Sequence, residues 1–119
     1  MQITFTNNQK QITLEAKNCN LIQKITGLTF TKKEKAKILL FDFKKQTKNP
    51  IHSLFVFFDF LAIWLDENNQ VIEIKKVSPW KLSINPNKTF TKLVEIPINK
   101  KYKNMLTQFH QAILPSLLL

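Results

Sequence analysis

The sequence has no arginine, one glycine and one cysteine among its 119 residues. Arginine holds phosphates and guanine edges through paired hydrogen bonds, so its absence argues against a dedicated sequence-specific DNA-binding protein. Gly27 alone cannot form a Walker loop or a dinucleotide-binding fingerprint, because both need several glycines. Cys19 alone excludes an internal disulfide framework and is typical of a reducing compartment, which predicts a cytoplasmic location.

Histidine is scarce too, with only His52 and His110. A metal site needs clustered His, Cys or carboxylate side chains, so we expect no metal and no cofactor. His52 precedes Ser53, but neighbouring side chains of a strand point to opposite faces, so a direct Ser–His pair is not expected. We expect His52 to be half-buried and hydrogen-bonded to the backbone. A hydrolase-like pocket near His52, Asp66 and Glu95 stays open as an alternative, although an enzyme is not the favoured class.

One long hydrophobic run, residues 50–65, is interrupted by Asp59. It is shorter than the about 20 residues of a spanning helix, and a carboxylate at the bilayer centre costs on the order of 3 kcal/mol. Its many Phe residues favour strands, predicted at Ile51–Phe57 and Phe60–Asp66 with a bend near Phe58–Asp59. Both faces of these strands are apolar, which predicts that they lie at the centre of the fold, covered on both sides. The N-terminal MQITFTNNQK lacks a basic region followed by an apolar run, so no signal peptide is expected.

Alternating apolar residues predict further strands at residues 2–6, 11–16, 36–43, 71–77 and 89–98. The first two form a hairpin with Ile3, Phe5, Ile12, Leu14 and Ala16 facing inward. In the strand at 71–77, Ile72 and Ile74 should face the core and Glu73 and Lys75 the solvent. Short helices are predicted at 18–27 and within 100–114. The chain is therefore predicted to be one mainly-β domain, residues 1–119, forming a compact β-sandwich or barrel-like body.

Charge is strongly positive: 18 lysines against eight acids give a formal net charge of +10. Biased codon supply alone could explain the lysines, but a surface for nucleic acid or another polyanion remains an alternative. Trp80, which could stack on a base or cover a sheet edge, lies among lysines. That nucleic-acid set is Lys75, Lys76, Trp80, Lys81 and Lys88. The basic and apolar segment 101–119 leaves peripheral membrane contact as another alternative.

Four pieces of the sequence carry a family resemblance: KITGLTF (24–30), KILLFDF (37–43), residues 51–80 and LVEIPI (93–98). In order and spacing they resemble the uncharacterised domain of unknown function 192 family of archaea and bacteria. The resemblance covers about residues 3–98 and leaves 99–119 as a divergent segment. It implies a sandwich or barrel-like domain, often compared to a jelly roll, with a short helix. It implies no reaction.

The chain departs from the family pattern in the middle of its strongest matching piece. Where the family has a basic residue followed by Pro-x-Asp, this chain has Phe57 and then Asp59-Phe60-Leu61. We expect a repacked core or a contact surface there. The family-like polar positions that remain are the candidate ligand-binding residues: His52, Ser53, Asp66, Trp80 and Glu95. The expected function is a non-catalytic domain that binds a small ligand or a protein partner, with nucleic acid not favoured.

Overall fold

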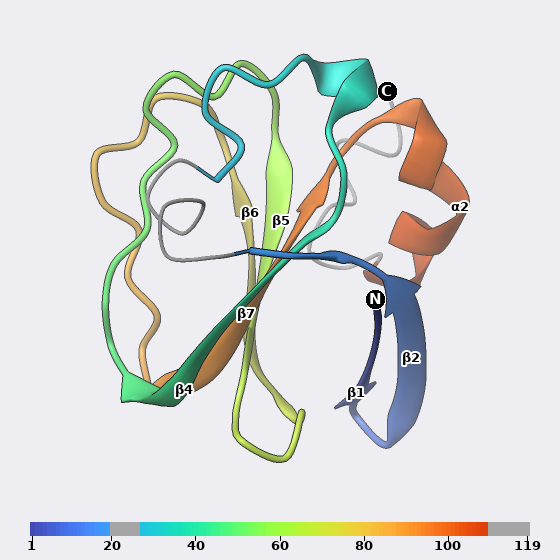
Figure 1. The fold of residues 1–119 in the computed structure, drawn as a ribbon, viewed down its shortest axis with the longest axis vertical. Helices are drawn as coiled ribbons and strands as arrows, with labels where there is room; N and C mark the ends of the chain where they lie inside the picture. The colour runs from blue at the N-terminus through green and yellow to red at the C-terminus, as the bar shows by residue number, and fades with distance from the viewer. Residues whose placement is uncertain (20–26, 110–119) are drawn as a thin grey trace.

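A computed structural model describes residues 1–19 and 27–109 of the chain as a mainly-β fold (Figure 1). Its elements are β1 (Gln2–Asn7), β2 (Lys10–Glu15), β3 (Lys17–Asn18), the 3-10 helix η1 (Lys33–Lys35), β4 (Leu39–Thr47), β5 (Phe60–Leu65), β6 (Val71–Val77), β7 (Phe90–Pro97), η2 (Lys100–Tyr102), α2 (Lys103–Leu106) and η3 (Thr107–Phe109). β1 and β2 form a two-stranded sheet, and the other strands form a five-stranded sheet in the order β3-β4-β7-β5-β6. The predicted mainly-β, sandwich-like fold is confirmed.

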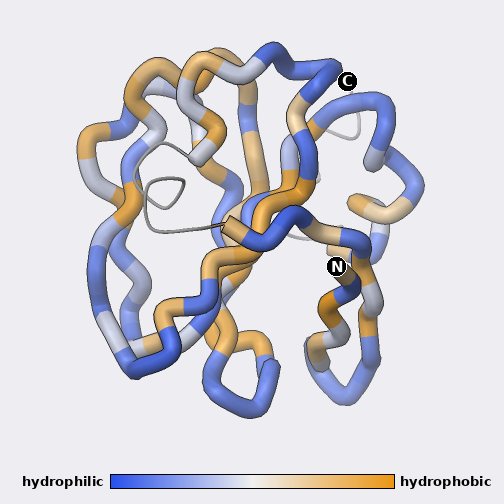
Figure 2. The backbone as a smooth tube through the Cα atoms, in the orientation of Figure 1, coloured by the Kyte–Doolittle hydropathy of each residue, from blue (hydrophilic) through white to orange (hydrophobic). Residues whose placement is uncertain are grey.

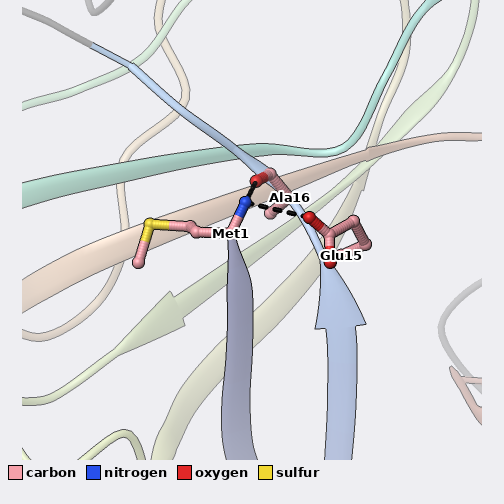
Figure 3. A network of polar contacts seen from close by, with 3 residues as sticks. All are labelled: Met1, Glu15 and Ala16. Atoms are coloured by element: carbon pink, nitrogen blue, oxygen red, sulfur yellow. Dashed lines mark hydrogen bonds and ion pairs between the residues drawn. The ribbon is translucent and has the colours of Figure 1, made fainter.

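The β1–β2 hairpin forms because apolar and polar residues alternate along both strands and the two residues between them adopt a hairpin turn. Asn8 and Gln9 both have left-handed backbone, with φ of 50° and 69°, as a two-residue hairpin turn requires. The predicted inward side chains of both strands are all buried. At the other end of the hairpin, the Met1 ammonium donates to Glu15 Oε1 and to the Ala16 carbonyl oxygen, each at 2.9 Å (Figure 3). These contacts hold the start of β1 against the end of β2.

The five-stranded sheet carries a hydrophobic cluster on each face, because β5 and β7 are apolar on both sides. The first face packs against the hairpin and the C-terminal helical turns, where Leu106 and Phe109 are buried. The second face is covered by loops, which contribute Leu28, Val56 and Phe58. Figure 2 shows the apolar strands through the middle of the molecule and hydrophilic turns at its lower end. The central position predicted for Phe60–Asp66 is confirmed.

The predicted strand at Ile51–Phe57 is wrong. Ile51 makes one isolated β-bridge with Ile84. The chain then turns at Leu54 and Phe55, and Phe55 has a φ of 59°. After the turn, Val56 is buried and Phe57 is exposed. The segment is therefore a loop that lies over the sheet rather than a strand within it.

Two further expectations fail in detail. Leu65 pairs with Val71 while Trp64 pairs with Glu73, so Ile72 is an extra residue in β6. This bulge places Ile72 and Ile74 against different hydrophobic clusters, so they do not share a face as predicted. The strand predicted to end at residue 43 continues as β4 to Thr47.

The predicted helices fare differently. Asn18, the expected cap of the first, lies in β3, Gly27 lies in a turn, and residues 20–26 lie outside the described residues. The C-terminal helix is present as successive helical turns from Lys100 to Phe109. His110 and Ile113 lie outside the described residues. No helix in the described parts of the chain combines the length and the apolar character needed to cross a membrane.

Candidate ligand-binding pocket

A pocket of about 500 Å³ lies on the second face of the sheet, under the loops. Strand side chains Phe41, Phe60 and Leu93 form its floor, and Leu28 and Val56 close it from the loops. These walls are apolar because they belong to the second hydrophobic cluster. The polar side chains on the pocket are Glu95, His52, Lys45 and Asn49. A mostly apolar pocket with few polar groups is the usual form of a small-molecule site.

Glu95 is the one acidic side chain among the described residues that line the pocket. It lies on β7, in register with Leu39 of β4 and Ala62 of β5, and is only 6% exposed. Burial raises the pKa of the Glu95 carboxyl from 4.5 to about 8. Within the described residues, its carboxyl oxygens receive no hydrogen bond. Near neutral pH the group is therefore chiefly a neutral acid that can both donate and accept.

Gly27 passes directly beside this carboxyl. Its φ is +51°, a left-handed conformation that glycine adopts without steric cost. A Cβ atom at this position would lie 3.4 Å from Glu95 Oε1 and 3.9 Å from Phe41 Cζ. The only glycine of the sequence thus lies where the turn needs a left-handed backbone and where the backbone passes close to Glu95.

His52 and Lys45 are exposed side chains at the pocket. His52 Nδ1 accepts a hydrogen bond from the Leu54 backbone N–H at 3.2 Å, so a neutral ring carries its proton on Nε2. The expected bond to backbone is confirmed, but the expected half-burial is wrong because the loop holds His52 outward. Nε2–H is left as a donor beside the pocket.

The other predicted ligand-binding residues lie elsewhere. Ser53 is fully buried, donates to the Ser78 carbonyl oxygen at 2.6 Å and accepts the Lys81 N–H at 2.7 Å, so it ties two loops together. Asp66 Oδ1 accepts the N–H groups of two residues in the β5–β6 turn. Trp80 is half-exposed and contacts other aromatic rings. The fold therefore brings together His52 and Glu95 and separates the remaining three.

The lysines proposed for nucleic acid do not form one free surface. Lys75 Nζ lies 3.2 Å from Glu73 and Lys76 Nζ lies 3.5 Å from Asp59, so both charges are partly neutralised. Lys81 and Lys88 are exposed.

The described residues also limit the chemistry available. None of those that line the pocket is Ser, Thr or Cys, the usual alcohol and thiol nucleophiles. In residues 1–19 and 27–109 no group of three or more His, Cys, Asp or Glu could hold a metal ion. The arrangement offers an apolar cavity, a neutral acid within it and two nitrogen donors beside it.

Comparisons with known proteins place the chain in a family. Residues 2–107 match the sequence model of DUF192, described as an uncharacterised ACR. The chain belongs to this family. The match includes β1 and α2, so the hairpin and the start of the C-terminal turns are part of the DUF192 domain. No curated protein matches the chain.

Two solved structures share the fold of this DUF192 protein. One, from Sinorhizobium meliloti 1021, is described as a proposed transcription regulator; it is 14% identical, with a TM-score of 0.70 over 87% of this chain and 83% of that one. The other, from Novosphingobium aromaticivorans DSM 12444, is a protein of unknown function; it is 12% identical, with a TM-score of 0.67 over 86% and 75% of the two chains. At these identities the likeness shows the fold alone, and the domain has no known function.

Proposed function

We propose that this chain is a non-catalytic binding domain for a small uncharged molecule with an apolar body and one hydrogen-bonding group. The observation that carries the proposal is Glu95, a neutral carboxylic acid in an apolar pocket whose described residues give it no partner. No described residue donates to this carboxyl, so a ligand in the pocket can supply hydrogen bonds that the protein does not. The apolar walls supply the remaining binding energy.

The charge of the ligand follows from the environment of Glu95. A cationic ligand would require the carboxyl to ionise where burial opposes ionisation, and its own charge would also lose water. A ligand group with both a donor and an acceptor, such as a primary amide, matches a protonated carboxyl directly. His52 Nε2–H and Lys45 can serve acceptors nearer the solvent.

Binding without turnover is favoured over hydrolysis because Ser53 is engaged between two loops and Asp66 in a turn. A cytoplasmic location also stays a proposal, supported by the presence of a single cysteine, Cys19, in the sequence. No contact among Trp80, Lys81 and Lys88 favours the alternative of nucleic-acid binding.

Calorimetric titration with two matched probes tests the proposal. Naphthalene-2-carboxamide is neutral and offers a donor and an acceptor, whereas 2-(aminomethyl)naphthalene has the same rings and a positive charge. We expect the amide to bind at about pH 6 and to lose about tenfold in affinity by about pH 9, as Glu95 ionises. The amine should bind more weakly at the lower pH.

Two variants separate Glu95 from the apolar walls. Glu95→Gln keeps a donor and an acceptor, so it should bind the amide with little dependence on pH. Glu95→Leu keeps the volume and removes the hydrogen bonds, so it should lose most of the affinity. Equal binding of the amide by wild type and Glu95→Leu, or no binding of either probe, would overturn the proposal.

A further inference from the structure

Five large apolar side chains are exposed on three loops at one end of the molecule. They are Phe30 (70% exposed), Phe55 (43%), Phe57 (59%), Trp80 (50%) and Leu82 (79%), and we call them the aromatic platform. The loops, residues 27–31, 52–58 and 78–84, lie side by side at the upper left of Figure 1. Figure 2 shows hydrophobic stretches in this region, in contrast to the hydrophilic turns at the opposite end.

The four rings of the aromatic platform form one continuous contact. Phe30 stacks on Phe55 with centroids 5.0 Å apart, and Trp80 meets Phe55 and Phe57 edgewise at 4.9 and 5.7 Å. Backbone hydrogen bonds fix the loops to one another: the Phe30 N–H donates to the Phe55 carbonyl oxygen and the Trp80 N–H to that of Ser53, each at 2.9 Å. The platform is therefore a built surface rather than a set of loose loop ends.

The backbone of the aromatic platform is strained. Phe30, Phe55 and Trp80 have φ of 60°, 59° and 64°, a left-handed conformation that bulky residues rarely adopt. Such strain persists only where the surroundings impose it, and it gathers at functional positions. Here it holds large apolar side chains in contact with water, so core packing alone does not explain it.

Charge complementarity indicates what covers the platform. The three loops contain one lysine, Lys81, and no acidic residue. Lys32 and Lys33 follow the first loop and precede Glu34, and Asp59, which follows the second loop, is paired with Lys76. Lys81 stands between Trp80 and Leu82, so a positive charge lies between two exposed apolar side chains. Exposed aromatic and aliphatic side chains can insert at the interface of a bilayer, and neighbouring lysine ammonium groups can contact its anionic headgroups.

We propose that the aromatic platform docks this domain on the surface of an anionic lipid bilayer. Phe30, Phe57 and Leu82 enter the headgroup region and the lysines contact the anionic headgroups. A single-stranded nucleic acid fits the surface less well, because bases stack on open ring faces and Phe55 is already covered by Phe30 and Trp80. Leu82, the most exposed of the five, offers no ring at all.

Docking would also place the candidate pocket near lipid. Leu28, His52 and Val56 line the pocket and belong to two of these three loops, 27–31 and 52–58. In residues 55–57 the side chains alternate, with Phe55 and Phe57 outward and Val56 inward to the pocket. An apolar ligand could thus pass between bilayer and pocket over a short path.

Vesicle binding followed by tryptophan emission tests the proposal. Trp64 is fully buried, so a change of emission on binding reports on Trp80. We expect a blue shift and co-sedimentation with phosphatidylcholine vesicles that contain about one third phosphatidylglycerol, and about tenfold weaker binding to phosphatidylcholine alone. Raised salt should weaken the binding to the anionic vesicles.

Matched variants locate the surface. Phe57→Ser combined with Leu82→Ser removes two exposed side chains and should lower vesicle binding about tenfold or more. Lys81→Gln should weaken it, whereas Lys10→Gln, with the same loss of charge at the hairpin turn, should leave it unchanged. Glu95→Leu should also bind vesicles as wild type does, which keeps this test independent of the pocket.

Three results would overturn the proposal. The first is no binding to anionic vesicles at low salt. The second is vesicle binding that the Phe57→Ser, Leu82→Ser variant leaves intact. The third is binding of an oligothymidylate, or formation of a dimer, that the same double variant abolishes while vesicles remain unbound.

Discussion

At the scale of single residues, the fold determines what Glu95 can do. Its side chain extends from an interior strand into an apolar pocket, where burial disfavours its charged form and raises its pKa. Asp66 has a different role, because its side chain accepts two backbone N–H groups in a turn. The same kind of group thus serves as a turn residue in one place and as a neutral acid in another.

Replacing Glu95 should change how stability depends on pH. Folding raises the pKa of this carboxyl from 4.5 to about 8, so between these values the folded chain keeps a proton that the unfolded chain releases. The contribution of Glu95 to stability is therefore present below about pH 4.5 and is lost as pH rises to about 8, by up to about 1.4 kcal/mol per pH unit. Thermal unfolding should show Glu95→Gln close to wild type at about pH 5 and clearly more stable at about pH 9.

Glu34→Gln, an exposed acid, is the control for loss of charge. Its unfolding temperatures should run parallel to those of wild type over the same range of pH. If Glu95→Gln also runs parallel, the carboxyl of Glu95 is not held neutral by the fold.

The sequence analysis included His52 and Glu95 among the candidate ligand-binding residues. It could not show that these two line the pocket and that Ser53, Asp66 and Trp80 do not. Which polar residues meet depends on loops whose paths are fixed by long-range hydrogen bonds. Gly27 was missed as part of the site, although a lone glycine in such a sequence is a signal. Its left-handed backbone and its approach to Glu95 explain why glycine stands there.

At the scale of elements, strands with clear limits were predicted well. β6 has its predicted bounds, because polar turn residues precede it and Ser-Pro follows it. The strand prediction for residues 51–57 was wrong because some apolar residues of this segment pack in the core and others are exposed. Val56 faces the core while Phe55 and Phe57 form an exposed surface, and composition alone cannot distinguish that pattern from a strand buried on both sides.

Ser53→Ala should loosen the loops that this hydroxyl joins. The change removes the bonds to the Ser78 carbonyl oxygen and the Lys81 N–H in a fully buried site, at a cost of about 1–3 kcal/mol. Urea unfolding should show that loss, and acrylamide should quench Trp80 more strongly. The matched control is Ser83→Ala, which removes an exposed hydroxyl and should change stability by no more than about 0.5 kcal/mol. Equal stability of the two variants would contradict the role given to Ser53.

At the scale of the whole molecule, the two faces of the five-stranded sheet are covered by different kinds of structure. The hairpin and the C-terminal helical turns cover the first face with regular structure. Loops cover the second face, enclose the pocket against the sheet and carry the aromatic platform on their outer side. Function commonly resides on loops that a rigid sheet positions. Alternation along the strands predicted the sheet, but it carries no information on how loops close over it.

The burial of Glu95 depends on the second face of the sheet and on the loops that cover it, so its ionisation reports on how that face is closed. The most direct test is an NMR titration of the Glu95 side-chain carboxyl carbon, assigned by its absence in Glu95→Gln. The account predicts a midpoint about pH 8, which naphthalene-2-carboxamide moves higher because it binds the protonated form. A midpoint near the ordinary 4.5, unmoved by the amide, would contradict it.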